Sequence, residues 1–108
     1  MTVKELCEKN GYKALCMPDP DREVTGGYAG DLLSWVMGRA SSGDAWITIM
    51  SNTNIVAVAT LADPACIILS EGVAPDEGTL DRAEAQGVNL LSSEKDTFAL
   101  SAEISRLI

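Results

Sequence analysis

Residues 45–70, AWITIMSNTNIVAVATLADPACIILS, decide the fold of this chain. The apolar runs at 45–50 and 65–70 are short and rich in β-branched residues, which is typical of buried strands in a parallel sheet. Residues 55–61 favour a strand by composition and a helix by position, because neighbouring parallel strands need a crossover that is usually helical. We predict a helix over 55–61, with Asn52 or Asn54 as its cap.

Apolar and amphipathic segments alternate along the rest of the chain as well. Upstream, the expected elements are a helix from the cap Thr2 to about Asn10, a strand over 12–17, and a helix over about 28–40 that follows the turn Thr25-Gly26-Gly27. Downstream, they are a helix from Pro75 to Gly87, a strand over 88–92, and a helix from Asp96 or Thr97 through Leu107. The pattern predicts one α/β domain, residues 1–108, with three α/β/α layers around a mostly parallel sheet of about four short strands.

Charge and composition exclude several classes of protein. The 108 residues include 16 acidic and 8 basic ones, a net charge of −8, which argues against a nucleic-acid-binding surface. No apolar run approaches the roughly 18 residues of a membrane span, and the first residues lack the pattern of a signal peptide. The chain has no histidine, which excludes histidine bases, catalytic triads and histidine metal ligands. We expect a cytoplasmic protein that binds neither nucleic acid nor membrane.

The three cysteines, Cys7, Cys16 and Cys66, are odd in number and lie far apart in the sequence. A small secreted domain more often has an even set of disulfide-bonded cysteines. We predict a reducing compartment and three buried free thiols. An iron–sulfur cluster on the three thiolates is the alternative, although the ligands of such clusters usually lie closer together. We expect no metal and no cofactor.

Two loops are the best candidates for a ligand site, because open parallel sheets bind ligands beyond the carboxyl ends of their strands. The glycine turn could present backbone amides to an anion at one helix start, and the loop 51–54 could present small polar side chains at another. In the structural alternative, the glycines form a tight turn, the asparagines cap a helix, and the acid at position 31 suits a helix start rather than a ligand or a metal. The candidate residues are Thr25, Gly26, Gly27, Asp31, Ser51, Asn52, Thr53 and Asn54.

The common phosphate-binding motifs are absent. A P-loop has the pattern G-x-x-x-x-G-K-[ST], and no Gly-Lys pair occurs in this chain. The dinucleotide fingerprint G-x-G-x-x-G is missing too. An anion or a nucleotide would have to bind through other groups, and catalysis on a nucleotide is not expected.

Residues 21–34, DREVTGGYAGDLLS, resemble the DRTGG domain family. The resemblance continues through WITI at 46–49, NIVAVA at 54–59 and IIL at 67–69, so it covers most of the chain. The motif is spread here over Asp21, Arg22 and the glycine turn, with Glu23 and Val24 inserted. Some small members carry a histidine just before the block at 54–59, and its role does not transfer to the residues SNT at 51–53 of this chain.

The resemblance implies an α/β fold similar to the amino-terminal domain of HPr kinase/phosphorylase. Members occur between CBS domains in regulatory pyrophosphatases and beside phosphotransacetylase domains, where they look like modules that dimerise or sense ligands. Short members are often labelled serine kinase, which the missing P-loop rejects here. They also resemble proteins encoded near iron-only hydrogenases, which suggests a link to redox metabolism.

We therefore expect a non-catalytic regulatory or ligand-sensing module of bacterial metabolism that forms a homodimer. A sensor of a nucleotide or a phosphometabolite is the alternative, and a small enzyme is a third reading. The predicted helix with Trp35, Val36 and Met37 carries more large apolar side chains than one buried face needs. It is the candidate dimer interface.

Overall fold

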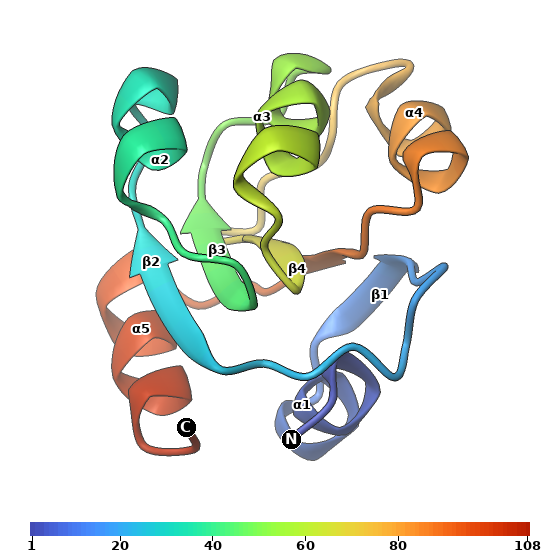
Figure 1. Ribbon diagram of the computed structural model, residues 1–108. Helices are drawn as coiled ribbons and strands as arrows, with labels where there is room; N and C mark the ends of the chain where they lie inside the picture. Colours follow the sequence, from blue (N-terminus) through green and yellow to red (C-terminus); the bar gives the residue numbers. More distant parts are fainter.

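A five-stranded sheet lies at the centre of the computed structural model, which describes residues 1–108 (Figure 1). Its strand order is β1-β5-β4-β3-β2; β2 to β5 run parallel, and β1 pairs antiparallel with β5. The α/β class and the mostly parallel sheet are confirmed, with one strand more than predicted. The elements in chain order are α1 (Val3–Asn10), β1 (Lys13–Cys16), β2 (Gly26–Ala29), α2 (Leu33–Arg39), β3 (Asp44–Thr48), α3 (Asn54–Ala62), β4 (Cys66–Leu69), α4 (Thr79–Gln86), β5 (Leu90–Ser92) and α5 (Thr97–Ser105).

Helices cover both faces of the sheet, as the predicted three layers require. In Figure 1, α2, α3 and α4 lie on one face and α1 and α5 on the other. Trp46 and Ile67 pack with α2, α3 and α4, whereas their neighbours Ile47 and Ile68 pack with α1 and α5. β3 and β4 are buried on both faces, which explains why their sequences are continuous apolar runs. None of the five helices has the length and apolar character needed to cross a membrane.

Residues 45–70 form the predicted β-α-β unit. α3 connects β3 to its parallel neighbour β4, and its β-branched residues Ile55, Val56 and Val58 are buried. The helix prediction for 55–61 is confirmed, because the crossover requirement outweighs the strand preference of these residues. The capping prediction is confirmed only in part: the Asn52 side chain accepts a hydrogen bond from the Asn54 amide, but the N-cap position is occupied by Thr53.

Most of the predicted helix ends are confirmed as well. Thr2 and Glu5 form a capping box at the start of α1, and Asp96 caps α5 through the Ala99 amide. α4 ends at Gly87, where φ is 71°. The helix starts were predictable because the capping side chains accept hydrogen bonds from free backbone amides. The end of α4 was predictable because glycine readily adopts the left-handed conformation that ends a helix.

The predicted start of α4 is wrong. The helix begins at Thr79 instead of Pro75. The intervening Asp76 does not act in the first turn of a helix, because it accepts a hydrogen bond from the Ser51 hydroxyl at 2.8 Å and its amide donates to the Ser51 carbonyl. A contact with the loop after β3 therefore displaces the helix start by four residues.

The prediction for the glycine turn is also wrong. Gly26–Ala29 form the edge strand β2, and α2 begins only at Leu33, without a side-chain cap. Gly26 lies against Asp44 of β3, so closely that an added Cβ would stand 2.5 Å from Asp44 Oδ1. Two glycines have little preference for a strand, so β2 is defined by its pairing with β3.

Candidate ligand site at the amino edge of the sheet

The eight candidate ligand residues do not form one site. Asp31 and the loop 51–54 lie at the carboxyl edge of the sheet, after β2 and β3. Thr25 and Gly26 lie at the opposite, amino edge, and Gly27 lies within β2. The two expected helix starts therefore do not converge on an anion.

At the carboxyl edge, Asp31 is already engaged within the protein. Its Oδ1 atom accepts hydrogen bonds from the Thr48 hydroxyl at 2.8 Å and from the Ile49 amide at 2.9 Å. Asp31 thus joins the end of β2 to the end of β3. This contact gives the acid a structural role that does not need a ligand or a metal.

The start of α3 offers few free donors. The Asn54 amide donates to the Asn52 side chain, and the Ile55 amide donates to the Asn52 carbonyl. The Val56 amide donates to the Thr53 carbonyl at 3.1 Å. An anion at a helix start relies on such amides, and here they are bonded inside the turn.

A polar hollow of about 310 Å³ lies at the amino edge instead. The antiparallel direction of β1 brings the loop that follows it to this edge, where α3 and α4 end. The volume is at the lower end of the range for small-molecule sites, roughly 300–1,000 Å³. The lining residues are Asp19, Arg22, Ala59, Thr60, Asp63, Pro64, Ala65, Gln86, Gly87, Val88 and Asn89.

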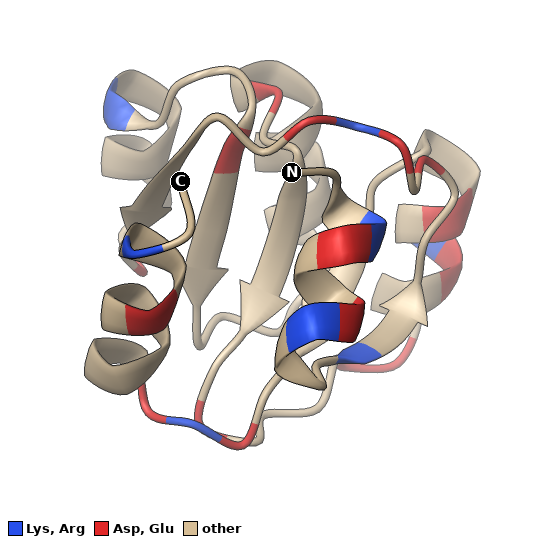
Figure 2. Cartoon of the chain, turned by 90° about the horizontal axis from the view of Figure 1, so that it is seen from below, with Lys and Arg blue, Asp and Glu red and all other residues tan.

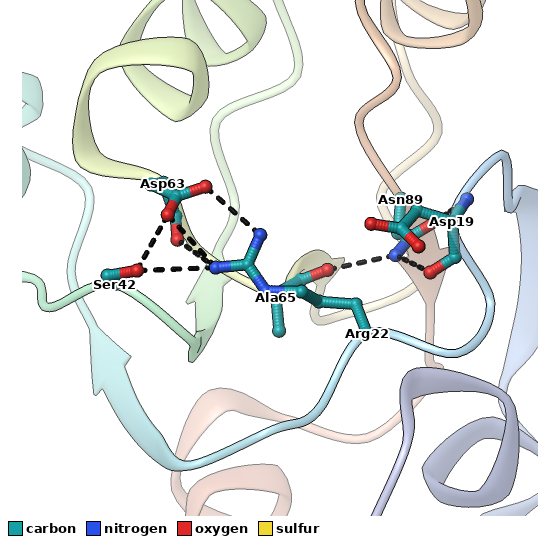
Figure 3. A network of polar contacts seen from close by, with 6 residues as sticks. All are labelled: Asp19, Arg22, Ser42, Asp63, Ala65 and Asn89. Atoms are coloured by element: carbon teal, nitrogen blue, oxygen red, sulfur yellow. Dashed lines mark hydrogen bonds and ion pairs between the residues drawn. The ribbon is translucent and has the colours of Figure 1, made fainter.

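Arg22 fixes one wall of the hollow by bonds to Asp63, just beyond α3 (Figure 3). The guanidinium donates to both carboxylate oxygens and to the backbone carbonyl of Asp63, each at 3.0 Å. The Ser42 hydroxyl donates to the same carboxylate at 2.6 Å. Arg22, and then Ser42, hold the pKa of Asp63 below its ordinary value, so the carboxylate is charged.

Asn89 fixes the opposite wall. Its side chain is buried, donates to the carbonyls of Asp19 at 2.7 Å and Ala65 at 3.0 Å, and accepts from the Asp19 amide at 2.9 Å (Figure 3). One side chain thereby joins the loop after β1 to the starts of β4 and β5. The hollow is preorganised, because both walls are held by several hydrogen bonds.

The hollow suits ligands that donate hydrogen bonds. The carboxyl ends of α3 and α4 carry the negative ends of the helix dipoles, and Asp19 and Asp63 add carboxylates. Thr60 and Gln86 are exposed and add a hydroxyl and an amide. A phosphate group would be repelled, whereas hydroxyl and amino groups find acceptors.

Sequence reasoning missed this hollow, although two signals pointed to it. Arg22 belongs to the stretch that resembles the DRTGG family, and Asn89 is a polar residue within a predicted strand. A buried asparagine needs hydrogen-bond partners, and the partners of Asn89 are the loop and strand starts that shape the hollow. The sequence did not predict that the loop after β1 lines this hollow, because that placement depends on the antiparallel pairing of β1.

The cysteines do not gather. Cys7 and Cys66 belong to the core under α1 and α5, and Cys16 belongs to the core on the other face. The three thiolates therefore cannot bind one iron–sulfur cluster, and no three Cys, Asp or Glu side chains converge as metal ligands. Burial raises the pKa of Cys16 to about 11 and that of Cys66 to about 12, which keeps both thiols neutral.

The candidate dimer interface on α2 is only partly available. Trp35 and Met37 are 52% and 49% exposed, and Arg39 stacks on the Trp35 ring at 3.7 Å. Val36, however, is buried in the core beneath α2. The prediction that Val36 contacts a partner is therefore wrong, because this residue anchors the helix to the sheet.

The sequence profile of the DRTGG domain matches residues 29–107. This chain belongs to the DRTGG domain family. The match begins after the glycine pair at 26 and 27, so membership in the DRTGG domain family rests on the helices and strands that follow β2. No curated protein sequence matches the chain.

A solved structure confirms the fold of this DRTGG domain. It contains the CBS and DRTGG domains of the regulatory region of Clostridium perfringens pyrophosphatase, complexed with the activator diadenosine tetraphosphate. The TM-score is 0.72 and the sequence identity 14%, over 94% of this chain. This chain spans 44% of that one, so it corresponds to less than half of the solved regulatory region.

Proposed function

We propose that this DRTGG domain is a non-catalytic regulatory module that senses a nucleotide, and that the nucleoside part binds in the polar hollow at the amino edge. The observation that carries the proposal is the preorganised hollow between Arg22, Asp63 and Asn89. The nucleotide activator of the similar pyrophosphatase region supports the ligand class.

The chemistry of the hollow selects the nucleoside end of such a ligand. Ribose hydroxyls and an exocyclic amino group can donate to the carboxylates of Asp19 and Asp63 and to the Gln86 side chain. The Arg22 guanidinium, held in place by Asp63, offers a planar surface on which a base can stack. The phosphates would extend into solvent, away from the acidic lining.

We infer further that the module does not catalyse a reaction. The chain has no histidine and no P-loop, and its thiols are buried, so it offers neither a histidine-activated nucleophile nor an exposed thiolate. We infer a cytoplasmic location and self-association of the module, for which the exposed apolar side chains Trp35 and Met37 are one argument. A link to hydrogenase or redox metabolism stays a prediction.

Isothermal titration calorimetry tests the ligand class. Adenosine, AMP and diadenosine tetraphosphate should bind, and inorganic phosphate should not, because the hollow repels anions. Binding of phosphate alone, or binding of none of the nucleosides and nucleotides at millimolar concentration, would contradict the proposal.

A pair of variants on α3 tests the location. Thr60 lines the hollow and is exposed, so Thr60→Trp should fill the hollow and weaken binding at least about tenfold. Ala57, exposed on the same helix but outside the lining, provides the matched control Ala57→Trp, which should bind like the parent. A folded Thr60→Trp variant with unchanged affinity would place the ligand elsewhere.

A further inference from the structure

The two edge strands of the sheet, β1 and β2, differ in how well they are protected against pairing with a strand of another molecule. β1 carries Lys13, is followed by Pro18 and Pro20, and has an irregular pairing between Ala14 and Cys16. Charges, prolines and irregularities are the features with which natural proteins protect sheet edges. β2, with the sequence GGYA, has none of them.

The outer edge of β2 offers backbone groups for pairing. β2 runs in parallel register with β3, and at its end the Gly30 amide donates to the Ile47 carbonyl at 3.1 Å, so the backbone groups of Gly30 face β3. Because backbone groups alternate in direction along a strand, the amides and carbonyls of Gly26 and Tyr28 also face β3, and those of Gly27 and Ala29 point away from it. They lie ready for a strand on the other side.

The side of the molecule around β2 carries no net charge. Residues 24–43 and 97–108, which form β2 and the flanking helices α2 and α5, contain two acids and two bases: Asp31, Glu103, Arg39 and Arg106. The whole net charge of −8 therefore lies on the other elements. In Figure 2, β2 bears neither acidic nor basic colour, whereas α1 and α4 bear both. Two copies of so acidic a chain repel each other least through the β2 side.

This side also carries most of the exposed apolar side chains. Six of the eight large hydrophobic residues that are exposed lie on α2, at the ends of β2 and β3, or on the α5 segment: Leu32, Trp35, Met37, Ile49, Phe98 and Ile108. An apolar groove of about 280 Å³ runs between β2 and α5. A specific interface buries about 800 Å² per partner, roughly a seventh of the 5361 Å² surface of this chain, which β2 with its two flanking helices can supply.

We propose that two copies of this chain pair antiparallel through β2 about a two-fold axis, which joins their five-stranded sheets into one continuous sheet. The proposal names the interface of the self-association inferred above and rests on that inference. α2 and α5 of one copy then pack beside those of the other and bury Trp35 and Phe98. Because the remaining edges are both the protected β1, assembly ends at the dimer.

A charge placed on β2 tests this interface. An added Cβ at Gly27 has no neighbour closer than 3.7 Å, so Gly27→Lys is compatible with the fold of one copy. In the dimer it would bury two unpaired ammonium groups, which should raise the dimer dissociation constant by about two orders of magnitude or more. Ala85→Lys, an exposed position on α4 with the same charge change, is the matched control.

Light scattering coupled to size exclusion measures the outcome. The parent and Ala85→Lys should have twice the 11.4 kDa mass of one chain, and Gly27→Lys should be monomeric at the same concentration. Phe98→Asp changes a side chain that is 74% exposed, and this variant should also be monomeric. It provides a second test of the interface if Gly27→Lys does not fold. In hydrogen exchange, the outward-facing amides of β2, position 27 and Ala29, should be protected in the parent and lose protection in the variants.

The results separate this proposal from the nucleotide site. A monomeric parent overturns the dimer, and a dimer that persists in folded Gly27→Lys and Phe98→Asp overturns the β2 interface. An open series of oligomers overturns the closed two-fold pairing. Nucleotide titration of the monomeric variants is an independent readout, because the hollow lies at the ends of α3 and α4 and contains no residue of β2.

Discussion

At the residue scale, the ion pair of Arg22 and Asp63 makes stability sensitive to acid. The pKa of Asp63 is lower in the folded chain than its unfolded value of about 3.9, so the pair stabilises the fold above that pH, and the contribution is lost as the pH falls through the lowered pKa. The Asp63 side chain is 58% exposed, which limits the contribution to less than about 1 kcal/mol.

Arg22→Ala should therefore lower the free energy of unfolding slightly at pH 7. Urea denaturation across the acid range should show the difference between parent and variant shrinking as the pH falls below the unfolded pKa of about 3.9 and then through the lowered pKa of folded Asp63. A difference of the same size at pH 2 and pH 7 would mean that Arg22 acts through packing of its stem and not through the charge pair.

Substitution of Cys66 tests how the buried core contributes to stability. The thiol is buried against the α1 and α5 core, and burial raises its pKa to about 12. Cys66→Ala should cost about 1 kcal/mol through lost packing and leave nucleotide binding unchanged. In the parent, stability should fall as the pH rises above about 8.5, since the unfolded thiol ionises first. Rapid alkylation of Cys66 in the folded chain at pH 8 would contradict this account.

At the scale of elements, Asn89 is the side chain on which the amino edge depends. It joins the loop after β1 to β4 and β5 through three hydrogen bonds. Asn89→Ala would remove the side-chain partner of the Ala65 carbonyl in a buried hydrogen bond, together with two bonds to Asp19, at a cost of about 2 kcal/mol. Chemical denaturation should show this loss, whereas Gln86→Ala, an exposed neighbour in the hollow, should change stability little. Equal effects of the two variants would contradict the role given to Asn89.

The elements also show which parts of the fold can be predicted from sequence. α3 was predictable against its own composition, because the crossover between two adjacent parallel strands is usually a helix. β2 was not, because GGYA has no strand preference and owes its conformation to pairing with β3. The antiparallel direction of β1 was not predictable either, since strand direction depends on contacts between β1 and β5, which are distant in sequence.

At the scale of the whole molecule, the predicted ligand residues lie at opposite edges of the sheet because the glycine turn is part of the strand β2. Because Gly26 and Gly27 belong to a strand, Thr25 lies just before its amino end, at the edge opposite the loop 51–54. The polar hollow instead combines segments near residues 20, 60 and 88, which only the complete sheet order brings together. Residue types can suggest such a site, but its assembly depends on topology.

An NMR titration of the labelled chain with diadenosine tetraphosphate tests the nucleotide site most directly. The account predicts saturable shifts of the amides around the hollow, those of Asp63, Gly87 and Asn89 foremost. The amides of the loop 51–54 should stay unchanged. Shifts confined to residues 51–54, or no saturable shift at millimolar nucleotide, would contradict a nucleotide site at the amino edge.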